Sequence, residues 1–262
     1  MHNAAFLLLF VSNQAGAIPR MRRLALLLPL VLAACVVVEP ISSGPPPQAP
    51  QAQASAPRLS ANAAAANFER VVERMEPVAS AECRARAPRR NCDFLIVVDT
   101  RPGLPPNAFQ TLDENGRPVI GFTLALLADA RNLDELAFIF GHEAGHHIAG
   151  HIPRMADEAR TGAIIAGALA SLTGADDRTI ERVAGLGGQI AARRFAPTFE
   201  LEADEIGTVL AWRGGFDPER GAAFFARIPD PGNAFLATHP PNAQRIDVVR
   251  RTLAQLRAGG RA

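Results

Sequence analysis

Apolar residues recur every three or four positions through most of the chain beyond residue 60, which is the spacing of one face of an α-helix. Between residues 61 and 75, Phe68, Val71, Val72 and Met75 follow this spacing and predict a helix. The second half of the chain is expected to be largely helical, over residues 132–150, 158–172, 178–194, 198–213, 217–227 and 240–257.

Strand patterns are confined to one short region. Residues 94–98 form an apolar run of strand length. Residues 107–112 and 118–122 predict a hairpin that turns at Asn115-Gly116. Proline cannot donate a ladder hydrogen bond, so Pro118 favours an edge strand. A small sheet or hairpin beside many helices predicts an α+β fold.

The segment 162–172 is apolar enough to resemble a membrane span. Its run of about eleven apolar or small residues is too short to cross a bilayer. We therefore expect a buried helix or a lid.

The N-terminal region has the pattern of an export signal. Residues 21–34 combine a short basic start with an apolar run of about ten residues that ends in small residues. The ending Leu-Ala-Ala before Cys35 resembles a bacterial lipobox, which predicts cleavage before Cys35 and a lipid on its side chain. The alternative is an ordinary signal peptide with an incidental cysteine. Residues 1–20 lack a basic start and are expected to be a mis-assigned upstream start.

Residues 35–58 are rich in Pro, Ala, Gln and Ser and predict a linker between the lipidated cysteine and a folded domain, 59–262. Val36 stands where Asp would favour inner-membrane retention. We therefore expect a periplasmic protein that is lipid-anchored to the outer membrane.

Charge excludes one class of partner. The 262 residues carry 27 basic and 26 acidic side chains, a net charge of +1, which gives no footprint for nucleic acid. An apolar fraction of 48% is enough for a sizeable core.

Cys83 and Cys92 are the two cysteines beyond Cys35, and they close an arginine-rich loop. In an oxidising compartment this pair predicts a disulfide. Its spacing does not suit a metal site, and no further cysteine is present to complete one.

The strongest chemical signal is His142-Glu143-Ala-Gly-His146, an H-E-x-x-H pattern. On a helix, positions i and i+4 share a face, so both imidazoles can bind one metal ion. Glu143 would then act as general base on the attacking water. The alternative is a helix whose histidines are simply packed or solvated.

A third ligand must come from downstream. Glu200 and Asp204 are i and i+4 on a predicted helix, so one can bind the metal while the other hydrogen-bonds a ligand imidazole. Glu202 is rotated by about 200° and is expected to face elsewhere. An ordinary acidic helix face is the alternative.

His147 and His151 are not expected to be ligands. His151 follows His142 by nine residues, about half a helical turn out of phase on a continuous helix. We expect both histidines to lie behind the ligands or at the surface.

Several motifs in this order resemble metallopeptidase family 48, which includes the heat-shock protease HtpX and the CAAX prenyl proteases, and most of all its bacterial periplasmic lipoprotein branch. They are Asn107-Ala-Phe109, Asp134-Glu-Leu-Ala137, His142–His146, Glu200-Leu-Glu-Ala-Asp204, and Thr238-His-Pro240 with Arg245-Ile246.

The resemblance implies a zincin-like fold with the sheet beside the active-site helix. It implies one Zn²⁺ held by His142, His146 and Glu200, with Asp204 supporting a ligand. It places His239 near the metal or the oxyanion of the intermediate, and Arg245 beside an internal carboxylate. The family's edge strand would pair with extended substrate, although residues 110–116 replace a glycine-rich turn found in many relatives.

We therefore expect a zinc-dependent endopeptidase of the bacterial envelope that acts in quality control on unfolded or misassembled envelope proteins. The helices over residues 158–194 are expected to cover its cleft. One alternative is a chaperone or assembly factor for outer-membrane proteins, in contact with their assembly machinery, whose zinc site is closed by His239. The other is a soluble peptidase in which Cys35 carries no lipid.

Overall fold

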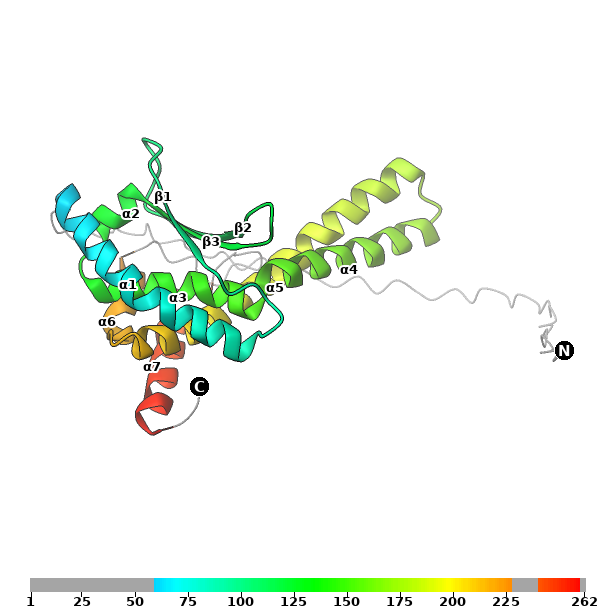
Figure 1. Ribbon diagram of the computed structural model, residues 1–262. Coiled ribbons are helices and arrows are strands. Elements are labelled where there is room, and N and C mark those ends of the chain that lie inside the picture. The colour runs from blue at the N-terminus through cyan, green and yellow to red at the C-terminus, as the bar shows by residue number, and fades with distance from the viewer. Residues whose placement is uncertain (1–58, 228–239, 260–262) are drawn as a thin grey trace, which may run out of the picture. The chain divides into compact units, whose positions relative to one another are not determined.

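The computed structural model describes residues 59–227 and 240–259. The segments 1–20, 21–34 and 35–58, with Cys35, lie outside the described residues, and so does His239. The expected α+β class is confirmed, since the chain is mostly helical with one small sheet (Figure 1). The elements are α1 (Ala61–Arg86), β1 (Leu95–Asp99), β2 (Ala108–Leu112), β3 (Pro118–Thr123), α2 (Leu124–Asp129), α3 (Leu133–Ala149), α4 (His151–Leu172), α5 (Asp177–Arg213), α6 (Pro218–Ala222), the 3₁₀ turn η1 (Ala223–Ala226) and α7 (Asn242–Arg257).

The sheet has the order β1-β3-β2, with β1 parallel and β2 antiparallel to β3. The hairpin of β2 and β3 is therefore as predicted. The expectation that Pro118 marks an edge strand is wrong, because β3 is the central strand. Pro118 is its first residue and lies opposite Leu112, while pairing with β1 starts only at Val119, so the missing N–H interrupts no ladder.

The core lies between α1, the sheet and α3. Phe122 of β3 packs against Phe68 of α1 and Phe140 of α3, with ring centroids 5.1 and 6.2 Å apart. Because aromatic side chains bury large apolar areas, this cluster ties the sheet to one side of α3. The rest of this core includes Val71, Met75, Ile120, Leu126, Leu136 and Leu210.

Helix α1 runs well beyond the predicted end at residue 75. It passes through Pro77, which is exposed, and ends at Arg86. The predicted disulfide between Cys83 and Cys92 is present and joins the end of α1 to the segment before β1. Closing a loop of this length stabilises the fold by about 2–3 kcal/mol through the entropy of the unfolded chain.

Two predicted helix boundaries are also wrong. Helix α4 begins at His151 rather than at residue 158, directly after Gly150, whose φ of 73° ends α3 and turns the chain. Residues 178–194 and 198–213 belong to one helix, α5, which continues through Pro197. The short α2 did not show in the sequence pattern, and the predicted helix 217–227 is α6 followed by η1.

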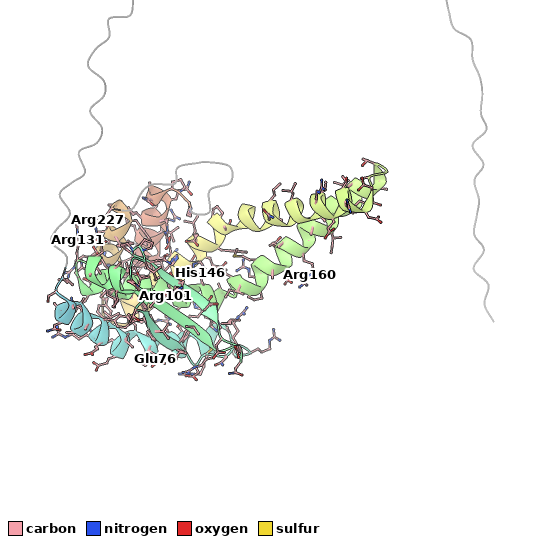
Figure 2. All side chains as sticks on the ribbon, turned by 90° about the horizontal axis from the view of Figure 1, so that it is seen from above. Glu76, Arg101, Arg131, His146, Arg160 and Arg227 are labelled. Carbon is pink, nitrogen blue, oxygen red and sulfur yellow. A yellow bond between two sulfur atoms is a disulfide. The ribbon has the colours of Figure 1, made fainter. Side chains whose placement is uncertain are left out.

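Helix α4 and residues 177–191 of α5 form an antiparallel pair that we call the arm. Its helices meet through small residues: a Cβ added at Gly162 would lie 2.5 Å from the carbonyl oxygen of Gly187. The arm points away from the sheet (Figure 1). Figure 2 shows Arg160 of α4 along the arm, to one side of His146.

The arm contradicts two expectations. The segment 162–172 is not buried, since Ile164 and Leu172 are 65% and 84% exposed. Nor do α4 and residues 177–191, whose side chains the structure describes, contribute to the lining of the cleft described below. Within the same described residues, no helix is long and apolar enough to cross a membrane.

Helices α3 and α5 cross at very short range. A Cβ added at Gly141 would lie 2.8 Å from the carbonyl oxygen of Gly207, and one added at Gly145 would lie 2.9 Å from that of Ala203. Only the absence of side chains allows the two backbones to approach this closely. The crossing therefore places residues 142–146 of α3 beside residues 200–207 of α5.

We predict that Gly207→Ala disturbs this crossing. Its new methyl group would lie 2.8 Å from the backbone nitrogen of His142, so one helix must move. We expect the free energy of unfolding, measured by denaturant titration, to fall by about 1–3 kcal/mol.

Gly185→Ala is the matched control, because an added Cβ there meets no atom within 4 Å. Replacing an exposed helical glycine is expected to leave stability unchanged or to raise it by up to about 1 kcal/mol. Equal losses in the two variants would contradict the role of the crossing.

Candidate metal centre

The two histidines of the H-E-x-x-H pattern share one face of α3. Asn132 caps this helix by accepting a hydrogen bond from the backbone N–H of Glu135, and Asp134 and Glu135 lie in its first turn. One turn separates His142 and His146, whose Nε2 atoms lie 3.0 Å apart. The two Nε2 atoms therefore converge on one point, where a single metal ion could contact both.

Glu200 of α5 completes the cluster. Its Oε2 lies 3.4 Å from Nε2 of His142, and its Oε1 lies 3.4 Å from Nε2 of His146. One donor atom from each of the three residues falls within 4.8 Å of the others. Two imidazoles and one carboxylate are a donor set for a catalytic metal with an open coordination position, so the residues fit a divalent ion.

Asp204 lies behind His142 rather than in the cluster. Its Oδ1 is 2.9 Å from Nδ1 of His142, and the side chain is completely buried. An ionised carboxylate only accepts hydrogen bonds, so Nδ1 of His142 carries a proton, and Nε2 is the nitrogen that can offer a lone pair to a metal ion. Of the two acidic residues that the sequence left as ligand candidates, the geometry brings Glu200 to the histidines and Asp204 to the back of His142.

Arg245, from the first turn of α7, neutralises Asp204. Its Nε and Nη2 donate to the two carboxylate oxygens of Asp204, each at 2.7 Å, a bidentate ion pair. The same Nη2 lies 3.7 Å from Oε2 of Glu200, and the guanidinium stacks 3.8 Å above the ring of Phe225. The internal carboxylate that the family resemblance implied for Arg245 is thus Asp204.

The pKa values of the two imidazoles move in opposite directions. Burial opposes protonation of His142, but the carboxylates of Asp204 and Glu200 outweigh it and raise its pKa to about 10. At His146, burial and the positive charge of His142 lower the pKa to about 3. The carboxylates therefore favour one positive charge at this cluster, and a bound cation can supply that charge in place of a proton.

The two other histidines of this region are both buried. His147 lies 2.7 Å from the carbonyl oxygen of Asn91 through Nε2. His151 lies behind His146, with 2.7 Å between the two Nδ1 atoms, and its Nε2 is 3.2 Å from Oε2 of Glu202. Burial lowers the pKa of both residues. The side chain of Glu202 thus points away from the cluster, as expected, and it contacts His151.

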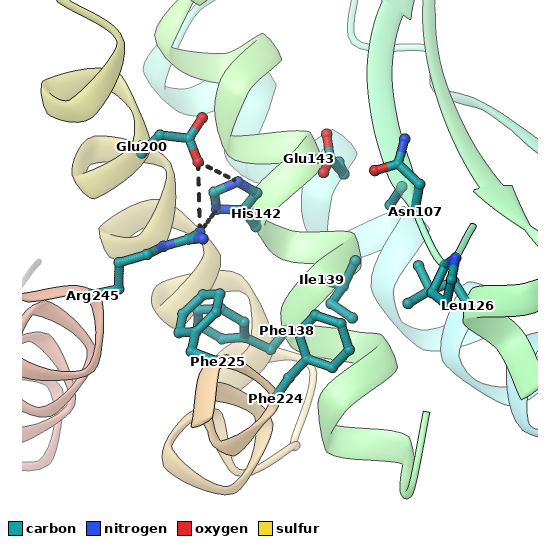
Figure 3. A pocket seen from close by; sticks show the side chains of 12 residues that line it. Asn107, Leu126, Phe138, Ile139, His142, Glu143, Glu200, Phe224, Phe225 and Arg245 are labelled. Carbon is teal, nitrogen blue, oxygen red and sulfur yellow. Dashed lines mark hydrogen bonds and ion pairs between the residues drawn. The ribbon is translucent and has the colours of Figure 1, made fainter. Parts of the chain in front are cut away.

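A cavity of about 230 Å³ opens beside the cluster. Glu143 lines it, and Figure 3 shows this side chain between His142 and Asn107. One wall is polar and the other is apolar, which suits a peptide whose backbone lies at the polar wall. The apolar lining consists of Pro106, Ala108, Leu126, Phe138, Ile139, Phe224 and Phe225.

Sequence reasoning missed part of this lining. Leu126 lies on α2, which is too short to show a helical period, and Phe224 and Phe225 lie on η1 at the end of the predicted helix 217–227. The pair of adjacent phenylalanines inside the predicted helix 217–227 was the available signal.

The model of peptidase family M48 matches residues 64–253. The chain is 31% identical over 146 residues to the β-barrel assembly-enhancing proteases of Escherichia coli K12 and Shigella flexneri, and 29% identical to that of Yersinia pestis. Each match covers 51% of this chain and 30% of the relative, so the chain spans less than a third of the length of these relatives.

We predict that Asp204→Asn weakens metal binding. The amide keeps the shape of the side chain but loses the charge that holds Nδ1–H of His142. Removing such a partner of a ligand costs about 10–100-fold in metal affinity, measurable by competition with a chelator of known affinity. Glu205→Gln, the same change at the exposed neighbouring position, is expected to keep the original affinity. An unaltered affinity in Asp204→Asn would contradict this role.

Proposed function

Because the chain belongs to peptidase family M48, we propose that it is a zinc-dependent endopeptidase whose ion is held by His142, His146 and Glu200. The observation that carries this proposal is the convergence of these three donors at a cavity that Glu143 also lines. Two histidines and one glutamate are the ligand set of many catalytic zinc sites.

Zinc supplies Lewis acidity at such a site, polarising the scissile carbonyl and favouring ionisation of the attacking water. The residues of the chain do the rest. Glu143 accepts a proton from that water and delivers it to the leaving amine. Asp204 holds Nδ1 of His142 so that Nε2 is directed at the cluster, and Arg245 holds Asp204 in place through a bidentate ion pair.

His239 is proposed to stabilise the oxyanion of the tetrahedral intermediate or to approach the metal. It lies outside the described residues. Its proposed place is supported by Arg245, six positions further along the chain, whose guanidinium reaches Asp204 and lies near Glu200.

Substrate is proposed to bind as an extended strand along β2. This strand is at the edge of the sheet, and its first residues are next to the cavity, since Asn107 and Ala108 line it. An extended peptide can add to such an edge through backbone hydrogen bonds, which require no particular side chains. Unfolded chains offer such segments and folded proteins rarely do.

The apolar wall of the cavity supports a side-chain preference. Phe224 and Phe225 of η1 lie beside Phe138 and Ile139 of α3 in this wall (Figure 3). A large apolar side chain next to the scissile bond would fill this space. Such residues are buried in folded proteins, so the preference again selects unfolded or misassembled ones.

We further propose that the chain acts in the bacterial envelope, as a periplasmic lipoprotein. The support is the export signal over residues 21–34, Cys35 in its lipobox context and the linker 35–58. The matched relatives are named for enhancing β-barrel assembly, which supports misassembled outer-membrane proteins as substrates and their assembly machinery as a partner.

We predict that Glu143→Gln abolishes cleavage and leaves metal binding intact. The amide cannot accept the proton, whereas the three ligands are unchanged. The test measures bound zinc and the cleavage of an unfolded protein in parallel for the wild type and the variant. Stoichiometric zinc without cleavage in either protein would contradict the peptidase and favour an assembly factor with a closed site. Absence of zinc would overturn the ligand assignment.

We also predict that Phe224→Ala weakens selection for large apolar side chains. Loss of this wall should lower kcat/KM for peptides with Leu or Phe beside the scissile bond about tenfold or more, relative to peptides with Ala there. Leu124→Ala, an exposed truncation on α2 that is not part of the lining, serves as the control. If the ratio of kcat/KM for these peptides to kcat/KM for the Ala peptides is unchanged in Phe224→Ala, this wall does not determine the preference.

A further inference from the structure

His151 occupies an unusual place for a residue outside the ligand set. It is the first residue of α4, is only 2% exposed, and directs Nδ1 at Nδ1 of His146 from 2.7 Å. This contact is on the side of the His146 ring opposite to Nε2, which faces His142 and Glu200. His151 therefore touches a proposed ligand from behind.

We propose that His151 is the positioning residue for His146: it accepts the Nδ1–H of His146 and thereby directs the Nε2 lone pair of His146 into the metal site. The inference rests on the proposed function, because it takes His146 as a metal ligand.

The placement of protons supports this assignment. Two imidazole nitrogens 2.7 Å apart need one proton between them, so one ring donates and the other accepts. If His146 binds a metal through Nε2, its proton is on Nδ1 and it must be the donor. His151 then accepts through Nδ1 and carries its own proton on Nε2.

Glu202 agrees with this direction of hydrogen bonding. Its Oε2 lies 3.2 Å from Nε2 of His151 and can accept that proton. The opposite arrangement would place the Nε2 lone pair of His151 against a carboxylate, which is repulsive. Arg154, which donates to the same Oε2 at 2.6 Å, keeps Glu202 ionised and so favours the first arrangement.

The ring of His151 is also held in orientation. It stacks on Phe199 with an interplanar angle of 14° and a centroid distance of 4.6 Å. The guanidinium of Arg154 lies 4.4 Å from the centroid of that same phenylalanine ring. Phe199 directly precedes Glu200, so one turn of α5 supplies a ligand, the ring that orients His151, and its acceptor Glu202.

The break between α3 and α4 makes the contact possible. With its positive φ, Gly150 ends α3 and lets His151 begin a new helix direction instead of continuing the old one. A Cβ at Gly150 would also collide with Nη2 of Arg90. The turn returns the His151 ring to His146, two residues after the last residue of α3, Ala149.

The test compares His151→Phe and His151→Asn in the full chain. Phenylalanine preserves a planar ring against Phe199 but has no acceptor. Asparagine can place its Oδ1 near the position of Nδ1. We expect zinc affinity, measured by competition with a chromophoric chelator, to fall about 10–100-fold in His151→Phe and to be largely retained in His151→Asn. The visible spectrum of the Co²⁺-loaded proteins should change in His151→Phe only.

His147→Phe is the matched control, since His147 is also buried on this face of the molecule but hydrogen-bonds a backbone carbonyl rather than a ligand. It is expected to leave zinc affinity unchanged. His151→Ala gives a second comparison with His151→Asn, should the phenylalanine prevent folding, and thermal unfolding of each variant reports on folding.

Each result has a definite meaning. A wild type that binds zinc, with His151→Phe and His151→Ala of equal affinity to it, would overturn the inference and leave the proposed function intact. Equal losses in His151→Asn, His151→Phe and His147→Phe would show general damage and also overturn it. A wild type that binds no zinc would overturn the proposed function together with the inference.

Discussion

The contact on which the rest of this structure depends is the close crossing of α3 and α5. Gly141 against Gly207 and Gly145 against Ala203 leave no room for side chains between the two backbones. That spacing brings Glu200 within 3.4 Å of both histidines and lets Asp204 reach the back of His142. A wider crossing with ordinary side chains between the helices would move Glu200 and Asp204 away from the two histidines, and the cluster would be lost.

The two histidines of the cluster are supported in different ways. His142 relies on a buried carboxylate that Arg245 neutralises, so its support is a strong and fully compensated ion pair. Behind His146 stands a neutral imidazole, and the carboxylate of Glu202 is one step further away. His151 can thus orient the ring of His146 without placing a charge directly behind it.

Local patterns in the sequence predicted the parts of the fold that depend on local interactions. The hairpin of β2 and β3, the helix that carries H-E-x-x-H and the acidic pair Glu200 and Asp204 could all be found from spacing. The errors arise where tertiary packing overrides a local rule. Pro118 is tolerated in a central strand because the ladder with β1 begins after it, and Pro197 is tolerated inside α5.

The position of His151 shows the same limit within the site. On a continuous helix it would point away from the ligands, and only the left-handed conformation of Gly150 returns it to His146. The apolar wall depends on α2, which was not predicted, and on η1, which was predicted only as the end of a longer helix, 217–227. Contacts between segments far apart in the sequence decide such features, and a single sequence does not record them.

The arm has a consequence for the order in which the site assembles as the chain folds. Bringing His146 and Glu200 together through an open loop of that length would cost conformational entropy. Instead, α4 pairs with α5 along the arm, from Gly167 beside Ala184 to Gly162 beside Gly187, so contacts between near neighbours in the chain close the gap stepwise. We therefore expect pairing along the arm to start at its turn, residues 173–176, and to proceed toward His146 and Glu200. An arm lengthened or shortened by whole helical turns, in both helices together, is expected to leave His146 and Glu200 in place.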